Sequence, residues 1–138
     1  MTTSRCDAAV IRIAAAIIVD EQGRTLLVRK RGTKAFMQPG GKIARGESAF
    51  EALSRELGEE LGCRIGSSRP LGRFSAPAAN EEGTTVEAEL FAVNLTGEIV
   101  PAAEIDEARW HHPDAEPAFA LAPLTRDHVL PLVRSWAP

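Results

Sequence analysis

The sequence predicts an α/β fold, an α/β/α sandwich in which a mixed β-sheet lies between helices. The first observation behind this prediction is the order of the elements, which runs from a strand pair through a helix to further strands and a second helix. The second is size, because 138 residues with 44% hydrophobic content can bury one ordinary core. The third is the lack of internal repeats, so residues 1–138 are predicted to form a single domain.

The first elements are two strands and a glycine loop. Alternating β-branched residues predict a strand over 11–19, and residues 20–23 turn the chain into a second strand over 25–29, which together form an opening hairpin. A short apolar piece at 36–37 leads into the segment Gln-Pro-Gly-Gly at 38–41. Glycines there permit a close approach of the backbone to a ligand.

The next element is a helix over residues 49–61. Ser48 is its predicted N-cap, and Glu51 lies three residues on, the spacing of a capping box. Gly62 can adopt the left-handed conformation that ends a helix. Three leucines form an apolar stripe along one side.

Three glutamates gather beside this stripe. Glu56, Glu59 and Glu60 fall within an arc of roughly 100° on the helix. Carboxylates that lie so close together repel one another. They are stable when they extend into water, pair with cations or bind a hard metal. The helix therefore indicates a magnesium site that faces a phosphate-rich ligand.

The chain after this helix predicts further strands. Strands are expected over 70–74 and 86–95, with a turn at 80–84 between them. Residues 98–100 are expected to extend the sheet. Residues 101–110 are predicted to be an irregular acidic segment, of the kind that commonly carries functional groups.

A second helix is predicted near the C-terminus. Thr125 is its expected cap, and Pro131 is expected to kink it. Its apolar face is formed by Val129, Leu132, Val133 and Trp136.

The glycine loop and the first helix together carry a recognisable spacing. Its fixed positions are Gly41, Glu47, Arg55, Glu56, Glu59, Glu60 and Gly62. This pattern resembles the Nudix box of the MutT-like Nudix hydrolases. The resemblance implies the α/β/α sandwich of that family and a hydrolase that acts on phosphoanhydride bonds. Cys63 departs from the usual aliphatic residue at the last position of the box.

The resemblance also implies roles for individual residues. Glu56, Glu59 and Glu60 would bind the metal together with a loop carbonyl at Gly40, and they count among the catalytic residues. Arg55 and Glu47 would support the helix structurally. The general base stays open between Glu56 and an acid of a later loop, for which Glu104 is the candidate.

Basic residues beside the glycine loop are the candidates for phosphate binding. Arg29, Lys42 and Arg45 are the predicted substrate-binding residues, and Lys34 is a further cationic candidate in the same region. A guanidinium group matches the geometry of a phosphate through two hydrogen bonds.

The implied function is a Mg²⁺-dependent pyrophosphohydrolase, with Mn²⁺ as an alternative metal. The expected substrate is a small nucleotide: a nucleotide sugar, an ADP-ribose-like compound or a nucleoside triphosphate. One alternative is a noncatalytic nucleotide-sensing module on the same fold. A further alternative is an enzyme like isopentenyl-diphosphate isomerase, which needs an upstream cysteine, here Cys6. Homodimerisation is common in the family, and the stoichiometry stays open.

Charge and composition exclude other classes. A net charge of -3 argues against binding to a nucleic-acid polymer, which requires a basic face. The apolar stretch 8–19 is too short to cross a membrane and is interrupted by Arg12. Two cysteines are too few for a disulfide framework, so reduced thiols and a cytoplasmic location are expected.

Overall fold

The computed structural model describes residues 9–79 and 81–136. Cys6, the upstream cysteine of the isomerase alternative, and Asn80 of the predicted turn lie outside these residues. In chain order the elements are β1 (Ala9–Ile17), β2 (Thr25–Lys30), β3 (Phe36–Met37), β4 (Gly40–Lys42), α1 (Ala49–Leu61), β5 (Arg64–Pro77), β6 (Thr84–Thr96), β7 (Ile105–His111), the π-helical segment η2 (Thr125–Val129) and α2 (Leu130–Arg134).

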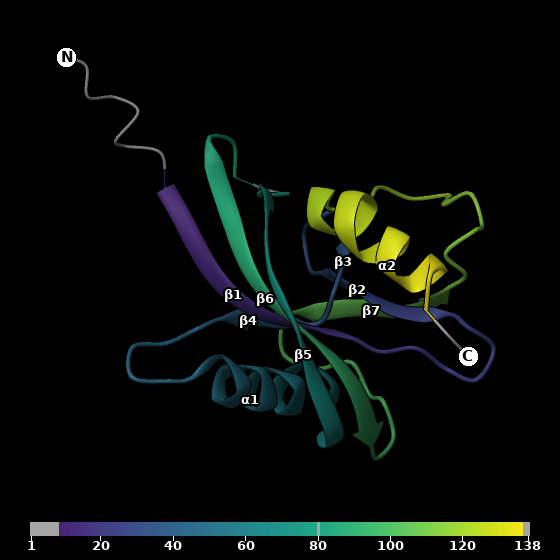
Figure 1. The fold of residues 1–138 in the computed structure, drawn as a ribbon, viewed down its shortest axis with the longest axis horizontal. Coiled ribbons are helices and arrows are strands. Elements are labelled where there is room, and N and C mark those ends of the chain that lie inside the picture. The colour runs from purple at the N-terminus through teal and green to yellow at the C-terminus, as the bar shows by residue number, and fades with distance from the viewer. Residues whose placement is uncertain (1–8, 80, 137–138) are drawn as a thin grey trace.

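The strands form two sheets (Figure 1). The larger sheet has the order β4-β1-β6-β5, and the smaller one has the order β3-β2-β7. Strands β1 and β6 run parallel, with Ile13 opposite Ala88, whereas β4 and β5 are antiparallel to their neighbours. The larger sheet is therefore mixed, as the sequence predicts.

Helices cover the two faces of this mixed sheet, α1 on one side and the η2–α2 segment on the other (Figure 1). The side chains of β1 alternate between the two cores, as the period of a strand requires. Ala14 and Ala16 lie in the cluster that contains the leucines of α1. Ala15 and Ile17 lie in the cluster that contains Val129 from the C-terminal helical segment. This arrangement confirms the predicted α/β/α sandwich.

Helix α1 has the bounds that the sequence predicts, Ala49–Leu61. The Ser48 hydroxyl accepts a hydrogen bond from the Glu51 amide at 3.1 Å, and the Glu51 carboxylate accepts one from the Ser48 amide at 2.9 Å. Gly62 ends the helix with φ of 70° and ψ of 20°. Both predicted caps are confirmed, because capping depends on residues that are neighbours in the sequence.

The predicted opening hairpin is wrong, because its two strands belong to different sheets, although the predicted turn between them is present. The Asp20 carboxylate accepts hydrogen bonds from the amides of Gln22 and Arg24, which close the turn. Strands β1 and β2 then diverge after a single bridge between Val19 and Thr25. The physical reason is that β1 uses both of its edges for β4 and β6, while β2 pairs with β3 and β7.

Three further segments differ from the prediction. Strand β5 extends over Arg64–Pro77, and most of its side chains are exposed, so its hydrophobic pattern does not reveal its length. Residues 98–100 are not a strand. Within the segment predicted to be irregular, Ile105–His111 forms strand β7 because it pairs with β2, a partner distant in sequence.

The C-terminal helix also begins differently. Thr125 is buried, and its hydroxyl donates to the side-chain oxygen of Gln38 at 2.5 Å instead of capping the helix. The first turn is π-helical and passes into α2 at Leu130, directly before Pro131. Proline lacks an amide hydrogen, so it is tolerated in the first turn of α2.

The thiol and the helices can be compared with the predictions about cysteines and membrane crossing. Cys63, the cysteine within the described residues, is a free and buried thiol. Among residues 9–79 and 81–136, no helix has both the length and the apolar character that crossing a bilayer requires.

Candidate active site

A salt bridge fixes the loop before α1 to the helix. Arg55 donates from Nε and Nη2 to the two carboxylate oxygens of Glu47, at 2.7 and 2.9 Å. Glu47 also accepts from the Ala44 amide at 2.8 Å, and Arg55 donates to the Lys42 carbonyl at 3.2 Å. The Arg55 guanidinium, followed by the Ala44 amide, lowers the pKa of Glu47 to about 2. The same contacts raise the pKa of Arg55.

The glutamates of α1 differ in their surroundings. Glu60 is 3% exposed, and its carboxylate accepts a hydrogen bond from the Gly40 amide at 3.2 Å. Burial, followed by contact with Glu56, raises the pKa of Glu60 to about 8. Arg55 donates to Glu56 at 2.9 Å and lies 3.6 Å from a carboxylate oxygen of Glu59. Glu56 and Glu60 therefore share one small site, while Glu59 stays at its exposed margin.

Two glycines of β4 make this site narrow. A Cβ atom on Gly41 would lie 2.4 Å from the carboxylate carbon of Glu56. A Cβ atom on Gly40 would lie 2.2 Å from the Ala14 carbonyl oxygen, and Gly40 has a φ of 146°. Only glycine fits at Gly40, where the obstacle is backbone, whereas a side chain on Gly41 would have to push the Glu56 carboxylate aside. The backbone of β4 therefore directly borders the Glu56 carboxylate.

The donor set fits a hard divalent cation. The available ligands are carboxylate oxygens, which suit Mg²⁺ and Mn²⁺, and a dication would favour the charged form of the buried Glu60 beside Glu56. Within 9–79 and 81–136, no three His, Cys, Asp or Glu side chains lie close enough together to hold a metal ion as they stand. Glu59 accounts for the difference from the predicted trio, because its side chain is 54% exposed and turns toward Arg55.

The predicted phosphate-binding residues lie apart from one another. Arg29 donates to the Thr33 carbonyl and to Asp106, at 3.0 Å each, and so is engaged with strand β7. Lys42 lies at the end of β4 with an exposed side chain, and Arg45 is exposed in the loop that follows. The structure therefore places Lys42 in the glycine strand itself and directs Arg29 toward acidic groups, while Arg45 is exposed three residues after the strand.

Glu104 lies in a segment that is anchored to the end of α1. The Val100 amide donates to the Leu61 carbonyl at 2.9 Å, and the Ala102 amide donates to the Glu60 carbonyl at 2.8 Å. Glu104 follows two residues later with an exposed side chain, and its carbonyl accepts from the Arg31 amide at 2.7 Å. The segment thus runs beside the backbone of Glu60.

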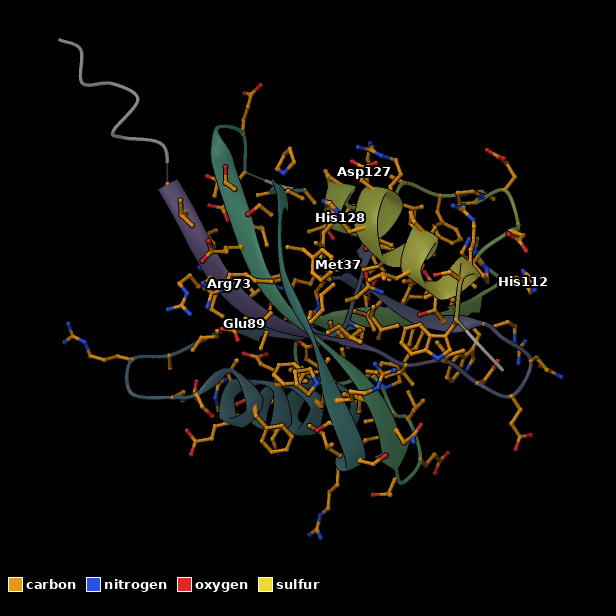
Figure 2. All side chains as sticks on the ribbon, viewed as in Figure 1. Met37, Arg73, Glu89, His112, Asp127 and His128 are labelled. Atoms are coloured by element: carbon orange, nitrogen blue, oxygen red, sulfur yellow. The ribbon has the colours of Figure 1, made fainter. Side chains whose placement is uncertain are left out.

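A cavity of about 150 Å³ opens on the other side of the glycine strand, lined by Gly40, Gly41 and Lys42 together with apolar side chains. Met37 lines it, and Figure 2 shows this residue beneath the helical segment that carries Asp127 and His128. Gln38 and Thr125 also line it and were not predicted as site residues. The sequence signal that could have identified Gln38 is its position as a polar residue directly before Pro-Gly-Gly. For Thr125 the sequence gives no signal of a site residue, because its position indicates only a helix cap.

The comparisons with known proteins agree with this geometry. A family model described as "NUDIX domain" matches residues 10–133. The putative 8-oxo-dGTP diphosphatase of Bacillus subtilis is 31% identical over 108 residues, which is 77% of this chain and 69% of that protein. The ADP-ribose pyrophosphatase of Methanocaldococcus jannaschii is 26% identical over 96 residues, 67% of this chain and 57% of that protein.

A solved structure supports the fold independently. The MutT NUDIX hydrolase from Burkholderia pseudomallei superimposes with a TM-score of 0.73 and covers 94% of this chain and 98% of that chain. At 22% sequence identity this similarity concerns the fold alone.

Proposed function

Because the chain belongs to the Nudix family of hydrolases, we propose that it is a Mg²⁺-dependent pyrophosphohydrolase that cleaves a diphosphate linkage in a small nucleotide. The observation that carries this proposal is the contact between the buried Glu60 and the Gly40 amide, with Glu56 beside it. Two carboxylates beside the two glycines of β4 leave room for a cation and for phosphate oxygens. The glycine strand lets these oxygens approach the backbone.

Each carboxylate has a distinct proposed role. Glu56 and Glu60 would hold the ion, and Glu59 would join them once its exposed side chain turns away from Arg55. When bound, Mg²⁺ would neutralise charge on the diphosphate and lower the pKa of a coordinated water. Arg55 and Glu47 act as structural supports, because their paired hydrogen bonds hold the glycine strand against α1.

The proton acceptor for the attacking water is either Glu56 or Glu104. Glu56 is favoured by its position beside Glu60. Glu104 is favoured because the segment that carries it lies beside α1, where the Ala102 amide donates a hydrogen bond to the Glu60 carbonyl. Glu104→Gln separates the two, because Glu104 is not among the proposed metal ligands. Loss of the acidic limb of the pH–rate profile in this variant would identify Glu104 as the base, and a retained limb would leave Glu56.

For the phosphates we propose Lys42 and Arg45 as direct contacts, because both are exposed beside the glycine strand. Arg29 reaches a phosphate only if it releases Asp106 and Glu107. It is therefore the least favoured of the three. A nucleoside triphosphate is the preferred substrate class, in line with the name of the Bacillus subtilis relative, and an ADP-ribose-like dinucleotide is the second class, in line with the name of the Methanocaldococcus jannaschii relative.

The test is a phosphate-release screen with Mg²⁺ over nucleoside triphosphates, ADP-ribose and nucleotide sugars, run with Glu60→Gln beside the unchanged protein. The glutamine keeps an oxygen that accepts from the Gly40 amide but removes the charge that binds the cation. We expect turnover to fall by about 100-fold or more. Magnesium should raise the melting temperature of the unchanged protein and not that of the variant.

The matched control is Glu116→Gln, which changes an exposed glutamate of the C-terminal loop. It should leave both turnover and the magnesium effect unchanged. Equal turnover in the Glu60 variant would contradict the assigned role of Glu60. Absence of turnover on every substrate class would contradict the proposed function.

A further inference from the structure

The segment between β6 and β7 contains a residue in a strained backbone conformation. Among residues 9–79 and 81–136, Ala103 is the only residue other than glycine with a positive φ, which is 55°. A side chain in this left-handed region costs free energy, so the conformation persists only where surrounding contacts hold it. Strain of this kind is frequent at functional sites. The contacts around Ala103 therefore bear on what the segment does.

Arg31, the residue that follows β2, makes the contacts that hold Ala103. Its Nη2 atom donates to the Ala103 carbonyl at 2.7 Å. Its backbone amide donates to the next carbonyl, that of Glu104, also at 2.7 Å. Side chain and backbone of one residue thus bind two consecutive carbonyls. They fix the course of the chain at Glu104.

The same segment is attached to the end of α1. The amides of Val100 and Ala102 donate to the carbonyls of Leu61 and Glu60, at 2.9 and 2.8 Å. These carbonyls belong to the last turn of the helix, where no partner exists within the helix itself. The hydrogen bonds to α1 on one side and to Arg31 on the other leave the segment little freedom, and they keep it beside the helix that carries the site.

Glu104 differs from the other acids of this region in having a free carboxylate. Asp106 and Glu107 both pair with Arg29, at 3.0 and 3.5 Å, and Glu107 also pairs with Arg109. A guanidinium stabilises the charged form of a carboxylate, which makes it a poor proton acceptor. The Glu104 side chain is exposed, and its carboxylate has no hydrogen bond or ion pair within the part of the chain that the structure describes.

We propose that Arg31 is a positioning residue that holds Glu104 beside α1, where Glu104 accepts the proton of the attacking water. In this step the water oxygen bonds to one phosphorus of the diphosphate, and the bond from that phosphorus to the bridging oxygen breaks. The leaving phosphate keeps the electron pair, and the proton goes to the Glu104 carboxylate. The inference rests on the proposed function and deepens it, because it selects Glu104 over Glu56 and names the residue that holds it.

The experiment measures kcat and KM with Mg²⁺ for Arg31→Ala, Glu104→Gln and the double variant. Glu104→Gln should lower kcat by about 100-fold or more, the usual contribution of a general base. Arg31→Ala should lower kcat by about 10-fold through misplacement of that base. KM should stay within about threefold in both, because the proton transfer occurs only in the transition state. In the double variant the arginine substitution should lower kcat by less than about twofold further, because it acts through Glu104.

Two arginine variants serve as controls. Arg31→Lys keeps a cationic donor for the Ala103 carbonyl and should recover most of the lost turnover. Arg64→Ala removes an exposed arginine of β5 and should leave kcat and KM unchanged.

Ala103 gives an independent pair of variants that leaves the arginine in place. Ala103→Gly accepts a positive φ without strain and should keep kcat. Ala103→Val places a β-branched side chain where such residues are genuine outliers, so it should lower kcat as Arg31→Ala does. This loss should also disappear when Glu104 is already glutamine.

An equal loss of kcat from Arg31→Ala with and without Glu104 would overturn the inference, because the arginine would then act on the fold. Full turnover of Glu104→Gln or of Arg31→Ala, beside an inactive Glu60→Gln, would also overturn it while the proposed function stands.

Hydrogen exchange separates the inference from the proposed function. The Ala102 amide, which is bonded to the Glu60 carbonyl, should exchange faster in Arg31→Ala than in the unchanged protein or in Arg64→Ala. If no substrate is hydrolysed, the proposed function fails, and faster exchange still supports the positioning role of Arg31. Equal exchange in the three proteins overturns that role.

Discussion

Gly41 shows at the scale of a single residue why this loop contains glycine. The limit is space and not backbone conformation, because an added Cβ would meet the carboxylate of Glu56 at 2.4 to 2.7 Å. Gly58, in the middle of α1, is the opposite case, since an added Cβ would meet nothing within 4 Å. The two positions allow the same substitution to be compared in two environments.

Gly41→Ala is expected to push the Glu56 carboxylate away from β4. Because that carboxylate is the far end of a flexible side chain, the loss of stability should stay below the roughly 1–3 kcal/mol that overpacking of a core costs. A shift of the order of 1 Å at a reacting centre lowers turnover by about 100-fold. Urea denaturation and steady-state kinetics of the variant measure the two effects.

Gly58→Ala is the matched control for this prediction. Alanine has a higher helix propensity than glycine, so the variant should gain up to about 1 kcal/mol and keep its turnover. If Gly41→Ala kept full turnover, the close approach of β4 to Glu56 would not matter for activity.

At the scale of the element, α1 is specified by its own ends. The reciprocal hydrogen bonds between Ser48 and Glu51 satisfy two amides that a helix otherwise leaves without partners. The same helix carries the carboxylates, so its start also fixes the position of the site. The strands lack such local signals, because their hydrogen bonds go to other strands.

Ser48→Ala is expected to lower the free energy of unfolding by about 1 kcal/mol through loss of the cap. Ser54→Ala changes an exposed serine inside the same helix and should gain a few tenths of a kcal/mol instead. Urea denaturation of both variants gives the comparison. Equal stability of the two would mean that the cap contributes nothing.

At the scale of the whole molecule, His111 connects β7 to the C-terminal part of the chain. It is 6% exposed, its ring lies 5.5 Å from that of Phe119, and its Nε2 atom has no partner in the described part of the chain. Burial, followed by the charges of His112, Arg109 and Arg134, lowers its pKa from 6.5. Its contribution to stability is therefore complete above about pH 6.5 and decreases as the pH falls, because the unfolded chain binds the proton more readily.

His111→Phe should remove this part of the pH dependence. Between pH 7.5 and 5.5 the free energy of unfolding should fall less for the variant than for the unchanged protein. Glu60 titrates in the same window with the opposite sign, because its pKa is raised to about 8, so the difference between the two proteins is the relevant quantity. His112→Gln removes only one of the charges that lower the pKa of His111, so it should change the pH dependence much less than His111→Phe does.

The sequence by itself determined the helix α1, its caps and the spacing of the glutamates. These features depend on residues within four positions of each other, so local rules suffice. The mixed sheet followed from the order of the elements, but the partners of its strands did not. Strand β7 was missed because its hydrogen bonds go to β2, far away in the sequence.

Only the tertiary structure decided how the site is completed. It placed the Gly40 amide on Glu60, turned Glu59 toward Arg55, and joined Gln38 to Thr125 across 87 positions. The physical reason is that burial and unpaired donors exist only once distant segments pack together. The sequence therefore determined which groups carry the proposed chemistry, whereas the packing of β4 between α1 and the C-terminal segment decided which of them meet.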